Sequence, residues 1–334
     1  MTDVHRGFSR RSLLGGGIMV AAAAATGARA VGRPDEPLFD AHAHLISPDK
    51  ARYPQVPADA PGAAVNLPPQ EFRQFGTARP MPQAEAMIGW MRNAGVAAMA
   101  AVQKRGTYGV DNRYILDSAR RFPETFYPVV VLDAQDAAVP ATVESLAANG
   151  LAGVRLTGAR GANGNFDWLA SDQAQRLWAV AARTGIVIDI MTMPFGHPPD
   201  ALPVYAALAE RFPTVRMVID HLNWPGALGA PSFGLDAIAR ALGAHRNAFF
   251  KFTTINIDKL QDARISPGGF LAHAVDIFGA DRILWGTDMG NTPGTYAELV
   301  GRGRAAAASL TPVARRAVMH DTGRALFTKR AGPA

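Results

Sequence analysis

The chain has 334 residues, of which 48% are hydrophobic and 19% are charged, a composition typical of an ordinary soluble globular protein. Its formal net charge is +6, but residues 1–30 hold four arginines and one aspartate, so the remainder carries only +3 (6 − 3) and has no basic run. Charge therefore gives no reason to expect nucleic-acid binding, and the absence of cysteine excludes a fold held by disulfides.

The first thirty residues have the features of an export signal. Arg10 and Arg11 precede a Gly- and Ala-rich apolar stretch that is too short to anchor in a bilayer, and Ala28-Arg29-Ala30 is typical of a cleavage site. The pattern resembles a twin-arginine signal. We expect residues 1–30 to engage bacterial export machinery, and residues 31–334 to be periplasmic or secreted, without stable membrane insertion.

Strand-like and helix-like segments alternate along the rest of the chain. Eight apolar runs are predicted as strands: Leu38–Leu45, Val96–Gln103, Phe126–Asp133, Leu151–Thr157, Ile186–Met193, Val215–Leu222, Ala248–Asn256 and Arg282–Asp288. Helical spacing lies between them, in Gln83–Asn93, Arg113–Arg121, Ala141–Ala148, Asp172–Arg183, Leu202–Arg211, Gly234–Leu242 and Gly269–Phe278. Eight βα units without a linker predict an α/β protein with one (β/α)8 TIM barrel. A doubly wound open sheet is the alternative, but no glycine-rich loop follows the first strand.

The first βα loop is unusually long. It runs from Ser47 to Pro82, contains many prolines and has little periodicity. Long loops of this kind tend to cover the active-site face of a barrel, so Tyr53, Arg73 and Phe75 are candidate substrate contacts. A functionless insertion is the alternative.

Polar residues gather where the predicted strands end, which is where barrel enzymes carry their chemistry. His42 and His44 end the first strand and share a face if the strand is regular. The other strand-end residues are Gln103, Lys104, Asp133, Arg155, Thr157, His221, Asn223 and Asp288. Two converging imidazoles can hold a metal or orient a substrate carbonyl.

Four motifs in this order resemble the amidohydrolase-related (amidohydrolase 2) barrels. They are Asp40-Ala41-His42-Ala43-His44, Gly153-Val154-Arg155, Asp220-His221-Leu222 after Arg211-Phe212-Pro213, and Trp285-Gly286-Thr287-Asp288. The similarity spans the mature chain and favours the lactonase-like branch, which includes fuconolactonase and 2-pyrone-4,6-dicarboxylate lactonase. The resemblance implies a hydrolase of small molecules.

Metal dependence stays open at this level. In metal-dependent members of the wider superfamily a histidine ends strand five, whereas this sequence places Met191 there, and Arg155 stands where a carboxylated lysine would be. A thioether is a poor ligand for a hard or borderline ion. His42, His44 and Asp288 can still bind one divalent, zinc-like ion, and the lactonase-like branch includes members that work without one.

These residues suit the hydrolysis of a lactone. Asp288 is predicted as the general base that activates water, and His42, His44 and His221 as the groups that polarise the carbonyl. Arg155 can bind a substrate carboxylate or pair with Asp133. Gln103, Lys104, Asn223 and Trp224 are further candidate substrate-binding residues.

The remaining candidates are weaker. Asp189 is expected on the same side as Met191, Phe195 can line the pocket, and His197 is expected at the surface. Structural roles are expected for His245, His273 and His320. Two alternatives to a lactonase remain. One is a metal-dependent amidohydrolase or nonoxidative decarboxylase, and the other is an exported binder of small molecules without catalysis.

Overall fold

The computed structural model describes residues 36–57, 71–74, 77–193 and 201–328, all of which belong to the unit Arg33–Ala334. The predicted signal, residues 1–30, lies outside the described residues, as do Phe75, Phe195 and His197. Within the described part of the chain, no helix combines the length and the apolar character needed to cross a bilayer.

Eight parallel strands form one sheet, in the order in which they occur along the chain. They are β1 (Leu38–Ala43), β4 (Val96–Val102), β5 (Phe126–Val131), β6 (Gly153–Gly158), β7 (Val187–Thr192), β8 (Met217–Ile219), β9 (Ala248–Thr253) and β10 (Ile283–Gly286). β1 and β10 meet through a parallel bridge between Ala43 and Met289, and His44 N donates to Met289 O at 2.9 Å. The predicted (β/α)8 barrel is therefore confirmed.

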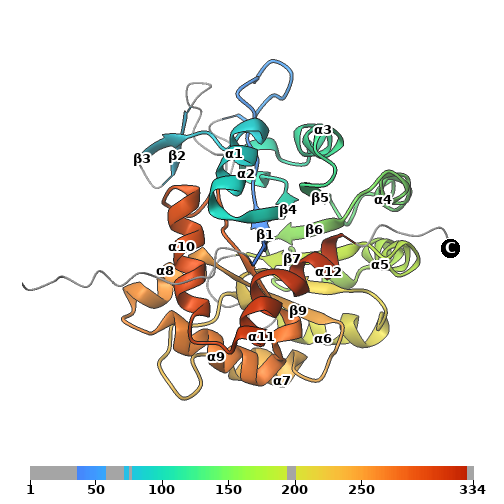
Figure 1. Cartoon of the computed structure of the whole chain (residues 1–334). Coiled ribbons are helices and arrows are strands. Elements are labelled where there is room, and N and C mark those ends of the chain that lie inside the picture. Colours follow the sequence, from blue (N-terminus) through green and yellow to red (C-terminus); the bar gives the residue numbers. More distant parts are fainter. Residues whose placement is uncertain (1–35, 58–70, 75–76, 194–200, 329–334) are drawn as a thin grey trace, which may run out of the picture. The chain divides into compact units, whose positions relative to one another are not determined.

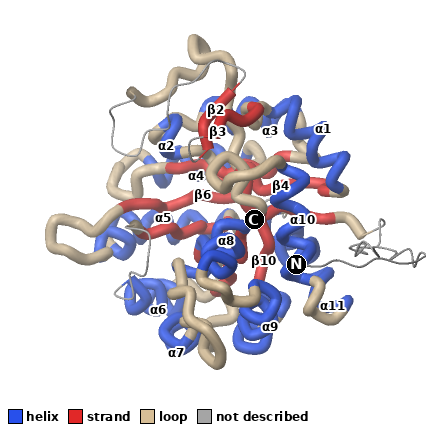
Figure 2. The backbone as a smooth tube through the Cα atoms, turned by 90° about the vertical axis from the view of Figure 1, so that its left-hand side faces the viewer, coloured by secondary structure: helices blue, strands red, loops and turns tan. Residues whose placement is uncertain are grey.

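Helices connect and surround the strands (Figures 1 and 2). Their bounds are α1 (Ala84–Ala94), α2 (Arg105–Tyr108), α3 (Arg113–Arg121), α4 (Val139–Ala148), α5 (Asp172–Thr184), α6 (Leu202–Arg211), α7 (Asp236–Leu242), α8 (Thr254–Asp262), α9 (Pro267–Phe278), α10 (Tyr296–Ala307), α11 (Pro312–Arg316) and α12 (Thr322–Phe327). Short 3-10 or π turns cover Asp167–Ala170, Asp220–Asn223, Ala280–Arg282 and Ala317–Asp321. The seven predicted helices are all present, within a few residues at their ends.

Alternation along each strand separates two cores. One face packs against the helices, while the other contributes to a small apolar cluster inside the barrel, which includes Phe39, Ala100, Val187 and Val218. Phe327 of α12 joins this inner cluster and is 1% exposed. The inner apolar layer supports the polar residues that follow it on the same strands, because side chains at i and i+2 share a face.

Near the end of β1, the regular alternation of side chains between the two faces of the strand is broken. Phe39 and Ala41 belong to the inner cluster, yet His42 also points into the barrel. The pairing of β1 with β4 shifts register between Asp40 and Ala43, which marks a β-bulge. A bulge inserts one residue and re-aims the side chains after it. The predicted shared face of His42 and His44 is thus reached through an irregular strand.

The long first βα loop contains more structure than expected. β2 (Glu71–Gln74) and β3 (Thr77–Pro80) form an antiparallel hairpin. Tyr53 is buried, its hydroxyl donates to Asp117 at 2.8 Å, and its ring lies 4.9 Å from that of Tyr114. Tyr53 therefore packs against α3, and the prediction that it contacts substrate is wrong. Arg73 lies on β2, and its role stays a prediction.

Every predicted strand is longer than the observed one, and two of the differences have a clear local cause. β8 stops at Ile219 because His221, Leu222, Asn223 and Trp224 all have φ between 51° and 55°, a left-handed conformation. β9 stops at Thr253, where the side chains of Thr253 and Asn256 cap the N-terminus of α8. Strand-like composition continued past both ends and concealed these boundaries.

Candidate active site at the mouth of the barrel

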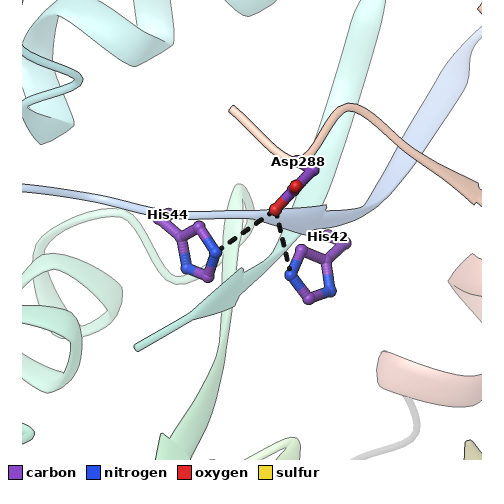
Figure 3. A group of neighbouring side chains, drawn as sticks. All are labelled: His42, His44 and Asp288. Atoms are coloured by element: carbon purple, nitrogen blue, oxygen red, sulfur yellow. Dashed lines mark ion pairs between the residues drawn. The ribbon is translucent and has the colours of Figure 1, made fainter. Parts of the chain in front are cut away.

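Three predicted residues meet at the seam between β1 and β10 (Figure 3). The Nε2 atoms of His42 and His44 lie 3.5 Å and 3.4 Å from Oδ1 of Asp288. All three side chains are buried, and the two imidazoles meet edge to face with centroids 5.0 Å apart. The carboxylate thus faces two imidazole edges at the C-terminal end of the barrel.

Backbone and side-chain contacts fix Asp288. Its N–H donates to His42 O at 2.7 Å, and its φ is +52°, which a short polar residue tolerates. Asn291 donates to Oδ1 at 2.9 Å and Thr292 to Oδ2 at 3.1 Å. Burial by itself would raise the pKa of Asp288, but the bond with His44 and the neighbouring histidines hold this pKa well below its usual range. Asp288 is therefore ionised at neutral pH.

His221 reaches the same cluster from the left-handed turn after β8. Its ring lies 5.1 Å from that of His42, and its Nδ1 lies 2.6 Å from Thr253 Oγ1. Asn256 donates to His221 O at 2.9 Å, while its Oδ1 accepts from Thr253 N at 3.0 Å. A left-handed residue other than glycine costs about 1–2 kcal/mol. Thr253 and Asn256 hold the strained turn, and so they hold His221.

The three histidines are neutral at physiological pH. Burial lowers the pKa of His221 to about 4 and lowers the pKa values of His42 and His44 as well. A neutral imidazole carries one N–H donor and one acceptor nitrogen. The histidines therefore offer hydrogen-bond donors and lone pairs, rather than positive charge, to their surroundings.

A buried charge network lies below the histidines, and sequence reasoning missed its centre. Lys251 of β9 is 0% exposed and contacts Asp189 Oδ2, with Asp220 Oδ1 at 3.0 Å and His42 Nδ1 at 3.1 Å. Asp220 Oδ2 also lies 2.7 Å from Arg155 Nη2. Two cations and two carboxyl groups thus share one buried network. Burial raises the pKa of Asp189 to about 7, whereas Arg155 and Lys251 hold the pKa of Asp220 well below its usual range. A lysine inside the apolar run Phe249-Phe250-Lys251-Phe252 is a signal that could have revealed this network.

The structure corrects the expectation for Arg155 and Asp133. Arg155 is buried and pairs with Asp220, whereas Asp133 is exposed and accepts from Gln135 N at 2.9 Å. The predicted alternative of an Arg155–Asp133 pair is therefore wrong. Met191 Sδ lies 2.6 Å from Arg155 Nη2, so the thioether borders the network. Asp189 lies on the inner side with Met191, as expected.

The other predicted binding residues differ in their surroundings. The side-chain Nε2 of Gln103 donates hydrogen bonds to the carbonyl oxygens of Gly109 and Asp111, at 2.9 Å and 3.1 Å. Gln103 therefore holds the segment around α2. Lys104 donates to Asn291, and burial lowers its pKa to about 8. Asn223 is 7% exposed within the left-handed turn, and its role stays a prediction.

Trp224 packs directly on the cluster. Its ring lies 4.3 Å from that of His221 and carries the Lys259 ammonium 4.6 Å from its centroid. The remaining histidines lie elsewhere: His245 follows α7, His273 on α9 contacts Phe233, and His320 pairs with Asp321. Structural roles for these three stay a prediction.

A cavity of about 280 Å³ opens at the ends of β5 and β6, and its lining includes none of the four cluster residues His42, His44, His221 and Asp288. Arg105, Asp133, Thr157 and Trp168 are among the residues that line it. Thr157, which lines the cavity, is the sheet partner of Met191, whose thioether borders Arg155. Space for a small molecule is therefore present at this end of the barrel.

Two groups of side chains have the donor types and spacing of a metal site. They are His42, His44 and Asp288, and His42, Asp220 and His221, each with ligand atoms within 4.8 Å of one another. Nε2 of His42 is buried without a hydrogen bond, as a ligand nitrogen would be. By type and spacing, the first group suits a divalent ion such as zinc.

The fold and the cluster place this chain in a known class. The amidohydrolase family model matches residues 39–329, so the chain belongs to that family. This confirms the resemblance drawn from the sequence motifs.

Three individual proteins illustrate the similarity. An L-fucono-1,5-lactonase from Burkholderia ambifaria is 28% identical over 209 residues, which cover 59% of this chain and 66% of the lactonase, slightly less than two thirds of its length. A putative 2-pyrone-4,6-dicarboxylic acid hydrolase from Pseudomonas putida has a TM-score of 0.65 at 21% identity, covering 87% of this chain and 97% of that one. A zinc-bound amidohydrolase from Burkholderia multivorans has a TM-score of 0.62 at 19% identity, covering 87% and 99%. The two structures share the fold.

Proposed function

We propose that this protein hydrolyses a small cyclic ester, with Asp288 as the general base. The observation that carries the proposal is the ionised Asp288 carboxylate, which faces the imidazoles of His42 and His44 at the barrel mouth. The similarity to an L-fucono-1,5-lactonase supports the same reaction class. Lactones of sugar acids or of aromatic breakdown products are the substrates that we propose.

Each proton in the reaction has a place. The Asp288 carboxylate takes a proton from water as the water oxygen forms a bond to the carbonyl carbon. The carbonyl oxygen then gains negative charge, which an N–H donor of the histidine cluster stabilises. Neutral His44 donates its one N–H to Val102 O at 2.8 Å and accepts from Asn291 at Nε2, so His42 is the proposed donor. When the ring C–O bond breaks, the leaving oxygen takes the proton back from Asp288. The product is an open hydroxy acid, and the carboxylate is restored.

By residue type and spacing alone, a divalent ion would suit the same residues. His42 Nε2, His44 Nε2 and Asp288 Oδ1 would hold it. The ion would supply Lewis-acid polarisation of the carbonyl. Asn291 donates to both His44 Nε2, at 2.8 Å, and Asp288 Oδ1, so an ion would have to displace this amide.

The decisive experiment compares two aspartates on loops that follow barrel strands. Asp288→Asn is expected to lower kcat on a panel of lactones by about 10²–10⁴-fold, the usual share of a general base. Asp136→Asn is the matched control, because Asp136 is exposed and lies outside both the cluster and the cavity lining, and we expect it to retain kcat. Unchanged turnover in Asp288→Asn would exclude the proposed mechanism.

The same assay separates the alternatives. A non-catalytic binder would bind lactones without opening any of them. A metal-dependent amidohydrolase or decarboxylase would carry stoichiometric metal, and chelation would abolish its activity. We expect lactone opening to continue after chelation.

We also propose that residues 1–30 direct export through the twin-arginine route. The sequence Ser9-Arg10-Arg11-Ser12-Leu13 supports this proposal. Replacing both Arg10 and Arg11 by lysine should leave the protein in the cytoplasm, as fractionation of the producing cells would reveal. Export of the double variant at the wild-type level would refute this route.

A further inference from the structure

The unusual feature of this site is a lysine at the inner nitrogen of a candidate metal-binding histidine. Lys251 Nζ makes a hydrogen-bond contact with His42 Nδ1 at 3.1 Å, in a pocket where both side chains are fully buried. A lysine ammonium has three donors and no acceptor. Asp189 and Asp220, which also contact Nζ, are its counter-ions. The contact with His42 is therefore a hydrogen bond only if Nδ1 carries no hydrogen.

Asp220 is a competing partner for His42 Nδ1, as a hydrogen-bond acceptor rather than a donor. Its Oδ1 lies 3.2 Å from the same Nδ1 and would accept from an Nδ1–H group. The two contacts with Nδ1 have nearly equal lengths, 3.1 Å for Lys251 and 3.2 Å for Asp220, so the other partners of each group decide between them. Asp220 also has two cationic partners of its own, Lys251 and Arg155. The balance at Nδ1 thus favours the lysine as donor.

We propose that Lys251 is a positioning residue that holds His42 as the Nε2–H tautomer. In this form the outer nitrogen of His42, which faces Asp288 in Figure 3, is a hydrogen-bond donor and has no lone pair for a metal. His42 then acts as an N–H donor to the developing oxyanion. This catalytic consequence rests on the proposed hydrolysis, whereas the tautomer does not.

The arrangement explains what would convert the site into a metal site. A metal-bound histidine usually donates its other N–H to a carboxylate, and the loss of such a partner changes metal affinity by about 10–100-fold. Asp220 already stands at the distance of such a partner. Removal of the Lys251 ammonium would let Nδ1–H face Asp220 and would free the lone pair of Nε2.

The first test reads the tautomer in the wild-type protein. Long-range 1H–15N correlation spectra of labelled protein distinguish a protonated from an unprotonated ring nitrogen, and His42→Gln identifies the signals of His42. We expect an unprotonated Nδ1 and a protonated Nε2 at neutral pH. A protonated Nδ1 would overturn the proposal, whether or not the protein opens lactones.

The second test measures zinc binding by calorimetry, without reference to activity. Lys251→Met should bind Zn²⁺ about tenfold or more tightly than wild type. Lys104→Met is the matched control, because it also removes a cation near Asp288 but does not touch His42. Equal gains in the two variants would show an effect of charge alone and would overturn the proposal. If Lys251→Met does not fold, the spectrum of the wild-type protein still decides.

Discussion

Gly286 lies where the barrel closes, and a single methyl group there should damage both stability and activity. A Cβ at this position would lie 2.7 Å from His42 N and 2.7 Å from His42 Cβ. These atoms belong to the backbone of β1 or lie next to it, so they cannot rotate away. Overpacking of this kind costs about 1–3 kcal/mol. We expect Gly286→Ala to fall at the upper end of this range.

The same methyl group should move the catalytic pair apart. Asp288, two residues later, is held to β1 by its N–H bond to His42 O at 2.7 Å. Displacement of β10 from β1 therefore changes the distance between the Asp288 carboxylate and His42, and kcat should fall while KM changes less. Urea unfolding and steady-state kinetics measure the two effects on the same preparation.

Gly89 provides the matched control. It lies within α1, and a Cβ there would meet no atom within 4 Å. Gly89→Ala should stabilise the protein by about 0.5–1 kcal/mol, because alanine favours the helix. The two glycine-to-alanine changes should thus have opposite signs. Gly286→Ala with wild-type stability and wild-type kcat would refute the idea that the β1–β10 seam sets the site geometry.

Three further predictions concern groups around the cluster. Asn256→Ala should lose about 1–3 kcal/mol of unfolding free energy and lower kcat, because it removes three buried hydrogen bonds, two with Thr253 and one with His221 O, that hold the His221 turn. Urea unfolding and kinetics check this, and unchanged kcat would contradict it. Burial raises the pKa of Asp40 to about 6, so the folded protein retains a proton that the unfolded chain loses near pH 4. The free energy of unfolding that this retained proton contributes is fully present below pH 4 and is lost as the pH rises through 6. Asp40→Asn should abolish this part of the pH dependence of the unfolding free energy. An unaltered pH profile of unfolding would contradict the prediction. The pKa of Lys104, lowered by burial to about 8, predicts that kcat/KM declines above this pH, and that Lys104→Met removes the alkaline limb from its pH profile.

The barrel was predictable because parallel strands covered by helices have a distinctive composition. Runs such as Ile186–Met193 are apolar on both faces, and each is followed by a segment with helical spacing. The position of polar residues at the strand ends then located the mouth of the barrel, and His42, His44, His221 and Asp288 do meet there. Periodicity along the chain was enough for this level of detail.

The details of the site depend on features that periodicity cannot show. The bulge in β1 and the left-handed turn after β8 are local departures from regular geometry, and neither Ala41-His42 nor His221-Leu222 contains a glycine that would signal them. The sequence also could not show which charged side chains pair with one another. Arg155 and Asp133 both end neighbouring strands, but only the three-dimensional structure shows that Arg155 turns to Asp220 instead.

Some missed features did leave a trace in the sequence. Thr295-Tyr296-Ala297-Glu298 has the Thr-x-x-Glu pattern of a capping box, and α10 begins there with both reciprocal hydrogen bonds, at 3.3 Å and 2.6 Å. Lys251 interrupts a run of phenylalanines in a strand whose neighbours are buried. An unexpected charge in an apolar strand is therefore a better guide to a polar network than strand ends alone.

The left-handed turn at residues 221–224 places stability and turnover in conflict in any directed evolution of this protein. None of its four residues is glycine, yet each has a left-handed backbone conformation that a relaxed loop would not keep. The strain is retained because it presents His221 to Asp288. Variants chosen for heat resistance will therefore tend to relax this turn, and variants chosen for turnover will tend to restore it. Libraries that aim at thermostability should leave residues 221–224 and Asn256 unchanged and draw their gains from the outer helices.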